Sequence, residues 1–175
     1  IGMIPAYAMT TADGLIVTEG ATADNYNLKV EWPADGKPTL TMKDATINNN
    51  NYGSGLVKHS IRISGTADFV IQVKGTNVIN GSLTGDTGSA DYVRPNGIYA
   101  TNTGTLTIQG DSTKDSLWIN NNNGHCIRKE YNAFTVEKAF LKISTNNTSA
   151  NPQYGILLVY VSTGRESMSN LTIRN

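Results

Sequence analysis

Two short segments, Leu106-Thr107-Ile108 and Leu117-Trp118-Ile119, decide the fold expected for this chain. In each, the first and third residues are apolar and the middle residue differs from them. Such alternation is typical of a β-strand with one face buried. A polar bend joins the two segments, and Asn120 directly follows the second. Two strands and an asparagine turn therefore form a unit whose copies can be traced along the chain.

Copies of this unit recur with loops of unequal length between them. The copies of the first strand are Thr39-Leu40-Thr41-Met42, Phe69-Val70-Ile71, Phe134-Thr135-Val136 and Leu171-Thr172-Ile173. The copies of the second strand are Ala45-Thr46-Ile47, Asn77-Val78-Ile79 and Leu141-Lys142-Ile143. A third kind of segment follows the turn, with the copies Gly55-Leu56-Val57, Gly97-Ile98-Tyr99, Cys126-Ile127-Arg128 and Gly155-Ile156-Leu157.

This repeat predicts an all-β protein, a right-handed parallel β-helix built as a single-stranded solenoid. Three short strands per coil explain the irregular spacing, and the chain provides about four to five coils. Coils stacked about 4.8 Å apart share one apolar interior. Asparagine suits the turns because it tolerates left-handed backbone and can form side-chain ladders between coils.

The repeat also predicts the domain organisation. Residues 1–8 resemble the end of a secretory signal peptide, with Ala6-Tyr7-Ala8 as the cleavage site, or alternatively form an apolar first strand. Residues 9–37 are expected to be an N-terminal cap or first coil. The β-helix then covers 38–175 and is truncated or continued at its C-terminal end. An open edge there favours self-association unless something covers it.

Composition narrows the function. The 14 Lys and Arg balance the 14 Asp and Glu, so the chain lacks the basic face typical of nucleic-acid binders. No segment is apolar over enough residues to span a membrane. The single cysteine, Cys126, is expected to be a small buried residue. With the signal-like start, we expect a secreted or extracellular protein, with attachment to the cell wall as the alternative.

Outward positions are where function can reside. The outward column of the second strand is predicted to be Thr46, Val78, Trp118 and Lys142. The Trp118 indole offers a flat apolar face for a sugar, and Lys142 can contact a hydroxyl or carboxylate. Alternatively, a loop or a partner protein covers Trp118. The outward column of the first strand is expected to be an ordinary solvated strand face, formed by Thr41, Val70, Thr107, Thr135 and Thr172.

The third segment offers a second group of candidates. Its outward column is predicted to be Val57, Tyr99, Arg128 and Leu157, with Lys129 and Tyr131 nearby. An aromatic ring beside a planar cation suits an acidic sugar. The alternative is a solvated face of mixed charge.

Candidate metal ligands lie on the longest loop. Asp86 and Asp91 are oxygen donors of the kind that bind Ca²⁺. Their spacing does not match an EF-hand, so solvated turn carboxylates are the competing interpretation.

These stretches between residues 39 and 145 resemble the secreted bacterial carbohydrate-binding β-helix family, whose members are related in shape to pectate lyases. The resemblance is carried by the strands from Thr39 to Asn48, from Phe69 to Ile79 and from Asn96 to Ile108. It implies binding of plant cell-wall polysaccharides, including acidic ones, and bound Ca²⁺. Acidic pairs often precede the Leu-Thr-Ile strand in that family. Here those places hold Gly104-Thr105 and Asn132-Ala133, and only Asp68 keeps an acid.

Three functions compete: a non-catalytic module binding plant-type polysaccharide, a polysaccharide lyase, and a structural or adhesive stalk. Glycoside hydrolysis needs two carboxylates across the bond, and the sequence contains no Asp-Asp pair. A lyase could use Arg128 or Lys129 as base, with Glu130 nearby, but no acidic cluster accompanies them. We therefore expect a binder rather than an enzyme, with the lyase second.

Overall fold

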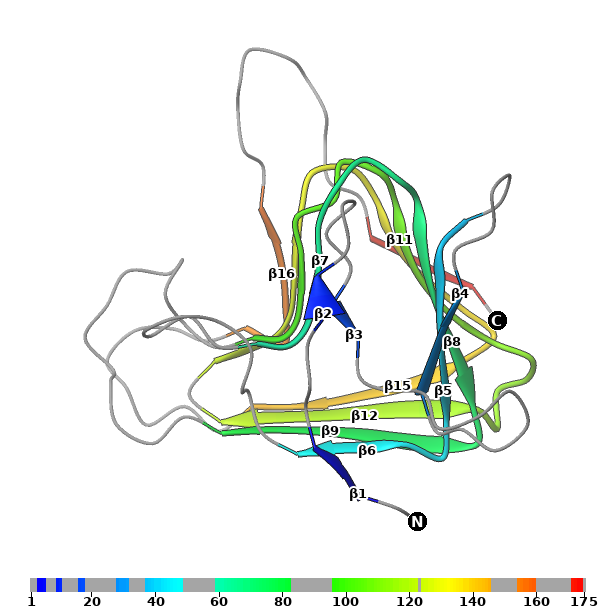
Figure 1. Cartoon of the computed structure of the whole chain (residues 1–175). Helices are drawn as coiled ribbons and strands as arrows, with labels where there is room; N and C mark the ends of the chain where they lie inside the picture. The colour runs from blue at the N-terminus through cyan, green and yellow to red at the C-terminus, as the bar shows by residue number, and fades with distance from the viewer. Residues whose placement is uncertain are drawn as a thin grey trace.

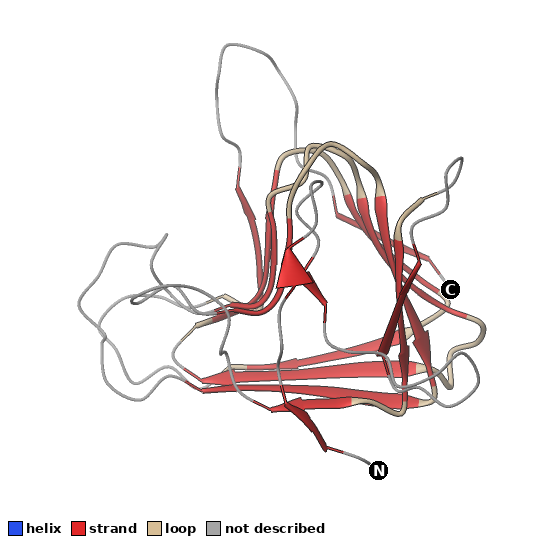
Figure 2. Cartoon of the chain, in the orientation of Figure 1, coloured by secondary structure: helices blue, strands red, loops and turns tan. Residues whose placement is uncertain are grey.

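The described part of the chain consists of strands and connecting turns. The computed structural model describes residues 3–5, 9–10, 16–17, 28–31, 37–48, 59–82, 96–122, 124–145, 154–159 and 171–174. Within these ranges there is no helix, and hence no helix that could cross a membrane (Figure 2). The expectation of an all-β protein is confirmed for these residues.

Most of the strands belong to three sheets, which lie around a common interior (Figure 1). Sheet 1 contains β4 (Leu28–Glu31), β5 (Thr39–Lys43), β8 (Phe69–Lys74), β11 (Leu106–Gly110), β14 (Phe134–Glu137) and β17 (Leu171–Arg174). Sheet 2 contains β1 (Met3–Pro5), β6 (Thr46–Asn48), β9 (Thr76–Ser82), β12 (Ser116–Asn122) and β15 (Phe140–Ser144). Sheet 3 contains β7 (His59–Ile63), β10 (Asn96–Ala100), β13 (His125–Glu130) and β16 (Ile156–Val159).

From β5 onward, successive strands belong to sheets 1, 2 and 3 in turn, and each strand from β5 to β14 pairs in parallel with the one three strands further along. This order is compatible with a parallel β-helix. Two described pairs are antiparallel. One joins β4 to β5 at the edge of sheet 1, and the other joins β2 (Met9–Thr10) to β3 (Ile16–Val17). Met3–Pro5, within the signal-like segment, pairs in parallel with β6.

In-register pairing stacks like residues inside the molecule. On sheet 2 one column consists of Ile47, Ile79, Ile119 and Ile143. On sheet 3 another consists of Ile61, Ile98, Ile127 and Ile156. The first three members of each column are buried, which confirms the predicted alternation for all of these positions except Ile61, a residue that the repeat did not predict. Cys126 is also buried, as expected, and burial raises the pKa of its thiol to about 11.

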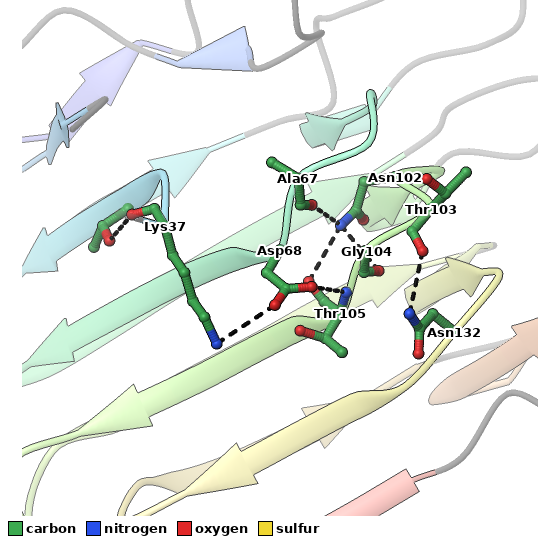
Figure 3. Close-up of polar contacts among 9 residues, drawn as sticks. Lys37, Ala67, Asp68, Asn102, Thr103, Gly104, Thr105 and Asn132 are labelled. Atoms are coloured by element: carbon green, nitrogen blue, oxygen red, sulfur yellow. Dashed lines mark hydrogen bonds and ion pairs between the residues drawn. The ribbon is translucent and has the colours of Figure 1, made fainter. Parts of the chain in front are cut away.

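Polar contacts, some made by the buried Asn102 and others by exposed side chains, join the segments at the corner between sheets 3 and 1 (Figure 3). The side-chain amide of Asn102 donates to the carbonyls of Ala67 at 2.9 Å and Gly104 at 3.1 Å. The Asp68 carboxylate accepts the backbone N–H of Thr105 at 2.8 Å and lies 3.5 Å from Lys37 Nζ. The bond from Thr105 and the charge of Lys37 hold the pKa of Asp68 below its usual range. Asp68 therefore links the segment before β8 to the segments before β11 and β5.

Two outward columns differ from the sequence prediction. Thr39, and not Thr41, is in register with Val70, because β5 pairs with β8 two residues earlier than expected. Thr41 lies beside Gln72 instead. On sheet 3, β7 places Arg62 beside Tyr99, where Val57 was expected. Gly55-Leu56-Val57 lies outside the described residues.

The C-terminal strands lie at sheet edges. Within the described residues, β15, β16 and β17 each have one paired neighbour. Leu171 and Ile173 are exposed, whereas Phe134 and Val136, their partners in β14, are buried. The apolar interior is thus less covered at this end, and self-association through it stays a prediction.

Gly104 is a position where the close approach of the Ala67 and Asp68 backbone demands glycine. A Cβ added there would lie 2.4 Å from the carbonyl carbon of Ala67. We expect Gly104→Ala to lower the free energy of unfolding by about 1–3 kcal/mol, as overpacking does in tight interiors. Urea unfolding followed by circular dichroism measures this. Thr103→Ala, at the exposed preceding residue, is the control and should stay within about 0.5 kcal/mol of the parent; equal losses would contradict the packing argument.

Candidate functional site

The outer face of sheet 2 carries an exposed aromatic residue. Trp118 in β12 is 36% exposed and lies in register between Val78 of β9 and Lys142 of β15. The Lys142 Nζ is 4.4 Å from the centroid of the indole ring, as in a cation–π contact. Thr46 of β6 completes the column that the sequence predicted. The structure therefore brings Trp118 and Lys142 together on one exposed surface.

A row of amides runs beside this column, two residues further along each strand. Asn80, Asn120 and Ser144 are in register across β9, β12 and β15. The Asn120 Nδ2 donates to the Asn80 Oδ1 at 3.0 Å, which confirms an asparagine side-chain bond between the adjacent strands β12 and β9. Sheet 2 thus presents an indole, an ammonium group and carboxamides in adjacent rows.

Tyr99 and Arg128 also meet, on the outer face of sheet 3. They are in register, and the Arg128 guanidinium carbon lies 5.5 Å from the Tyr99 ring centroid. Both are bonded to Glu130. Its Oε1 accepts the Tyr99 hydroxyl at 2.9 Å, Arg128 Nε at 3.1 Å and Arg128 Nη2 at 2.9 Å. Burial and the Glu130 carboxylate raise the pKa of Tyr99 to about 12, so the phenol stays a donor.

This arrangement limits what Arg128 can do for a ligand. Its exposure is only 8%, and that of Glu130 is 9%. The guanidinium is therefore largely neutralised within the protein, and its fork already holds a carboxylate. The sequence predicted that Tyr99 and Arg128 lie together, but not that the Glu130 carboxylate is bonded to both of them.

Lys129 does not lie on this surface with its neighbours. Its exposure is 0%, and its Nζ donates to the carbonyls of Asn102 at 2.6 Å and Glu130 at 2.7 Å. Strand alternation turns it inward, in register with the small Ala100 of β10. Burial lowers its pKa to about 8, against the opposing charges of Glu130 and Asp68. The structure thus corrects the expectation that Lys129 contacts a ligand at the surface.

Tyr131 lies in the turn that follows β13. Its φ of 59° is in the left-handed region, and its backbone N–H donates to Val159 at 3.3 Å. The side chain is half-buried. Tyr131 therefore belongs to the corner after sheet 3, outside the row that holds Tyr99 and Arg128.

Two residues of β7 that the sequence analysis did not select complete the group around Tyr99. Arg62 is in register with Tyr99, and the His59 ring centroid is 4.5 Å from the Tyr99 ring centroid. Burial and the charges of Arg62 and Arg128 lower the pKa of His59 to about 3, so the ring is neutral at neutral pH. The alternation in Ile61-Arg62-Ile63 is the sequence signal that identifies this strand.

The candidate calcium ligands Asp86 and Asp91 lie outside the described residues. Among the residues that are described, no group of three or more His, Cys, Asp or Glu is placed to hold a metal ion. Asp115, another loop acid, is engaged by backbone. It accepts the N–H groups of Gly75 at 2.8 Å and of Asp111 and Ser112 at 3.0 Å.

Comparison of the chain with protein-family models, curated proteins and solved structures gives no significant match. The surfaces described above must therefore be interpreted from their own geometry and chemistry.

The buried Lys129 makes stability depend on pH. Its pKa falls from 10.5 to about 8 on folding, so the unfolded state binds more protons between these values. We expect the free energy of unfolding to rise with pH across this window, by at most about 1.4 kcal/mol per pH unit. Urea unfolding at several pH values measures the slope.

Tyrosines also titrate at high pH. The contribution of Lys129 is therefore the difference between the slope of the parent and that of a Lys129 variant. Lys129→Met removes the titrating group and should abolish the rise, whereas the exposed Lys142→Met should keep it. An identical pH dependence in the parent and in Lys129→Met would show that folding does not lower the pKa of Lys129.

Proposed function

We propose that the chain is a right-handed parallel β-helix that serves as a secreted or cell-surface, non-catalytic module binding plant-type polysaccharide, neutral or acidic. The observation that carries the proposal is the exposed Trp118 with Lys142 on the outer face of sheet 2. Export is supported by the signal-like Ala6-Tyr7-Ala8 in the sequence.

The chemistry of sheet 2 suits a sugar. An indole face packs against the C–H groups of a pyranose ring, and exposed aromatic residues mark binding surfaces. The Lys142 ammonium and the Asn120 carboxamide can bond to the hydroxyls around that ring. Because the rows recur at the spacing of adjacent strands, about 4.8 Å, a chain molecule can contact several coils in succession.

The same structure weakens the lyase alternative. Lys129 is buried and bonded to two carbonyls, so it is not accessible as a base. Arg128 is held by Glu130. A structural stalk needs no exposed indole, whereas a binder does, and this favours the binder.

Trp118→Ala should weaken binding to cello-oligosaccharides or oligogalacturonides at least about tenfold, because the stacking surface at the centre of the site is lost. Trp118→Phe keeps a ring and should lose less. Isothermal titration calorimetry or affinity electrophoresis in polysaccharide gels measures the effect.

The control is Lys114→Ala, at an exposed turn residue away from Trp118, which should bind like the parent. A parent protein that binds neither ligand class would refute the binder and favour the stalk. Release of unsaturated uronate from oligogalacturonides by the parent protein would instead establish the lyase.

A further inference from the structure

The pairing of Arg128 with Glu130 shows what an arginine on the outer face of sheet 3 requires. Arg128 Nε and Nη2 both donate to the carboxylate two residues later in β13. Arg62 occupies the matching place in β7, in register with Tyr99 as Arg128 is. Two residues after Arg62, however, comes Ser64, so the carboxylate that Arg128 has is missing for Arg62.

Two buried nitrogen atoms of β7 side chains have no hydrogen-bond partner among the described residues. Within the described residues, Arg62 Nε is buried and has no hydrogen-bond partner, and the same holds for His59 Nε2. His59 Nδ1 accepts the backbone N–H of Asn96 at 3.2 Å. Since the ring is neutral, its single proton must then be on Nε2, which makes that atom a donor. Buried donors without acceptors are costly, so their presence calls for a physical explanation.

The charges around Tyr99 indicate which kind of chemical group would bind beside Arg62. Among the described side chains around Tyr99, Arg62 and Arg128 are cationic, and Glu130 is the one carboxylate and is already shared by Arg128 and Tyr99. We propose that Arg62, assisted by the Nε2–H of His59, forms a subsite for a carboxylate carried by the ligand. That carboxylate takes at Arg62 the place that Glu130 takes at Arg128.

The half-buried Arg62 connects this subsite to the surface, and its fork matches the planar geometry of a carboxylate. Where the carboxylate belongs to a sugar, the inference rests on the proposed polysaccharide-binding function and narrows the ligand to acidic sugars. A free carboxylate such as acetate tests the subsite without that assumption.

The test compares Arg62→Gln with the parent in three titrations: oligogalacturonides, cello-oligosaccharides and acetate. We expect Arg62→Gln to weaken oligogalacturonide binding at least about tenfold, because a charge-assisted pair is lost. Binding of cello-oligosaccharides should change less than twofold. Arg62→Lys keeps the charge but loses the planar guanidinium. Its affinity for oligogalacturonides should lie between that of the parent and that of Arg62→Gln.

Lys114→Gln is the matched control, with the same change of charge at a distant exposed turn. Acetate should shift the ¹⁵N resonance of His59 Nε2 in the parent and in Lys114→Gln, but not in Arg62→Gln. Equal effects of the two variants, or no acetate response in the parent, would overturn the subsite. If neither oligosaccharide binds but acetate does, the polysaccharide proposal fails while the subsite stands. Unfolding curves confirm that the variants fold.

Discussion

Parallel, in-register pairing between neighbouring strands is the constraint on which the rest of the structure depends. It places each residue directly beside its equivalent on the next strand of the sheet, so the isoleucine columns of sheets 2 and 3 fill one continuous interior. The same pairing requires backbones to approach closely at the corners. Gly104 and the buried Asn102 meet that requirement, one by having no side chain and one by satisfying carbonyl groups of the turn.

The same constraint organises the surface. Since every outward side chain lies beside another, single substitutions along the repeat create pairs with defined geometry, such as Trp118 with Lys142. The same arrangement lets charged side chains pair within the protein, as when Glu130 binds both Arg128 and Tyr99. Which outward residues remain available to a ligand is therefore decided by their neighbours one coil away.

The sequence predicted most strands of sheets 1 to 3, with β7 as an exception, and the Trp118–Lys142 column, because these follow from alternation and repeat alone. It misplaced Thr41 by two residues, since an extended strand offers more than one register with the same inward face. It missed Arg62 because Gly55-Leu56-Val57 matches the Gly-Ile-Tyr pattern of the third segment more closely than Ser60-Ile61-Arg62 does. The burial of Lys129 and the carboxylate bound to Arg128 depend on contacts between coils, which no single repeat reveals.

The central claim is that a polysaccharide binds to the outer face of sheet 2. The chain contains two tryptophans, Trp32 and Trp118, so an ¹H–¹⁵N spectrum shows two indole signals, which Trp118→Phe assigns. Titration with cello-oligosaccharides and oligogalacturonides follows both signals at once. The account predicts that the Trp118 indole shifts and saturates while Trp32 serves as the internal reference. A response confined to Trp32, or none at either residue, would contradict it.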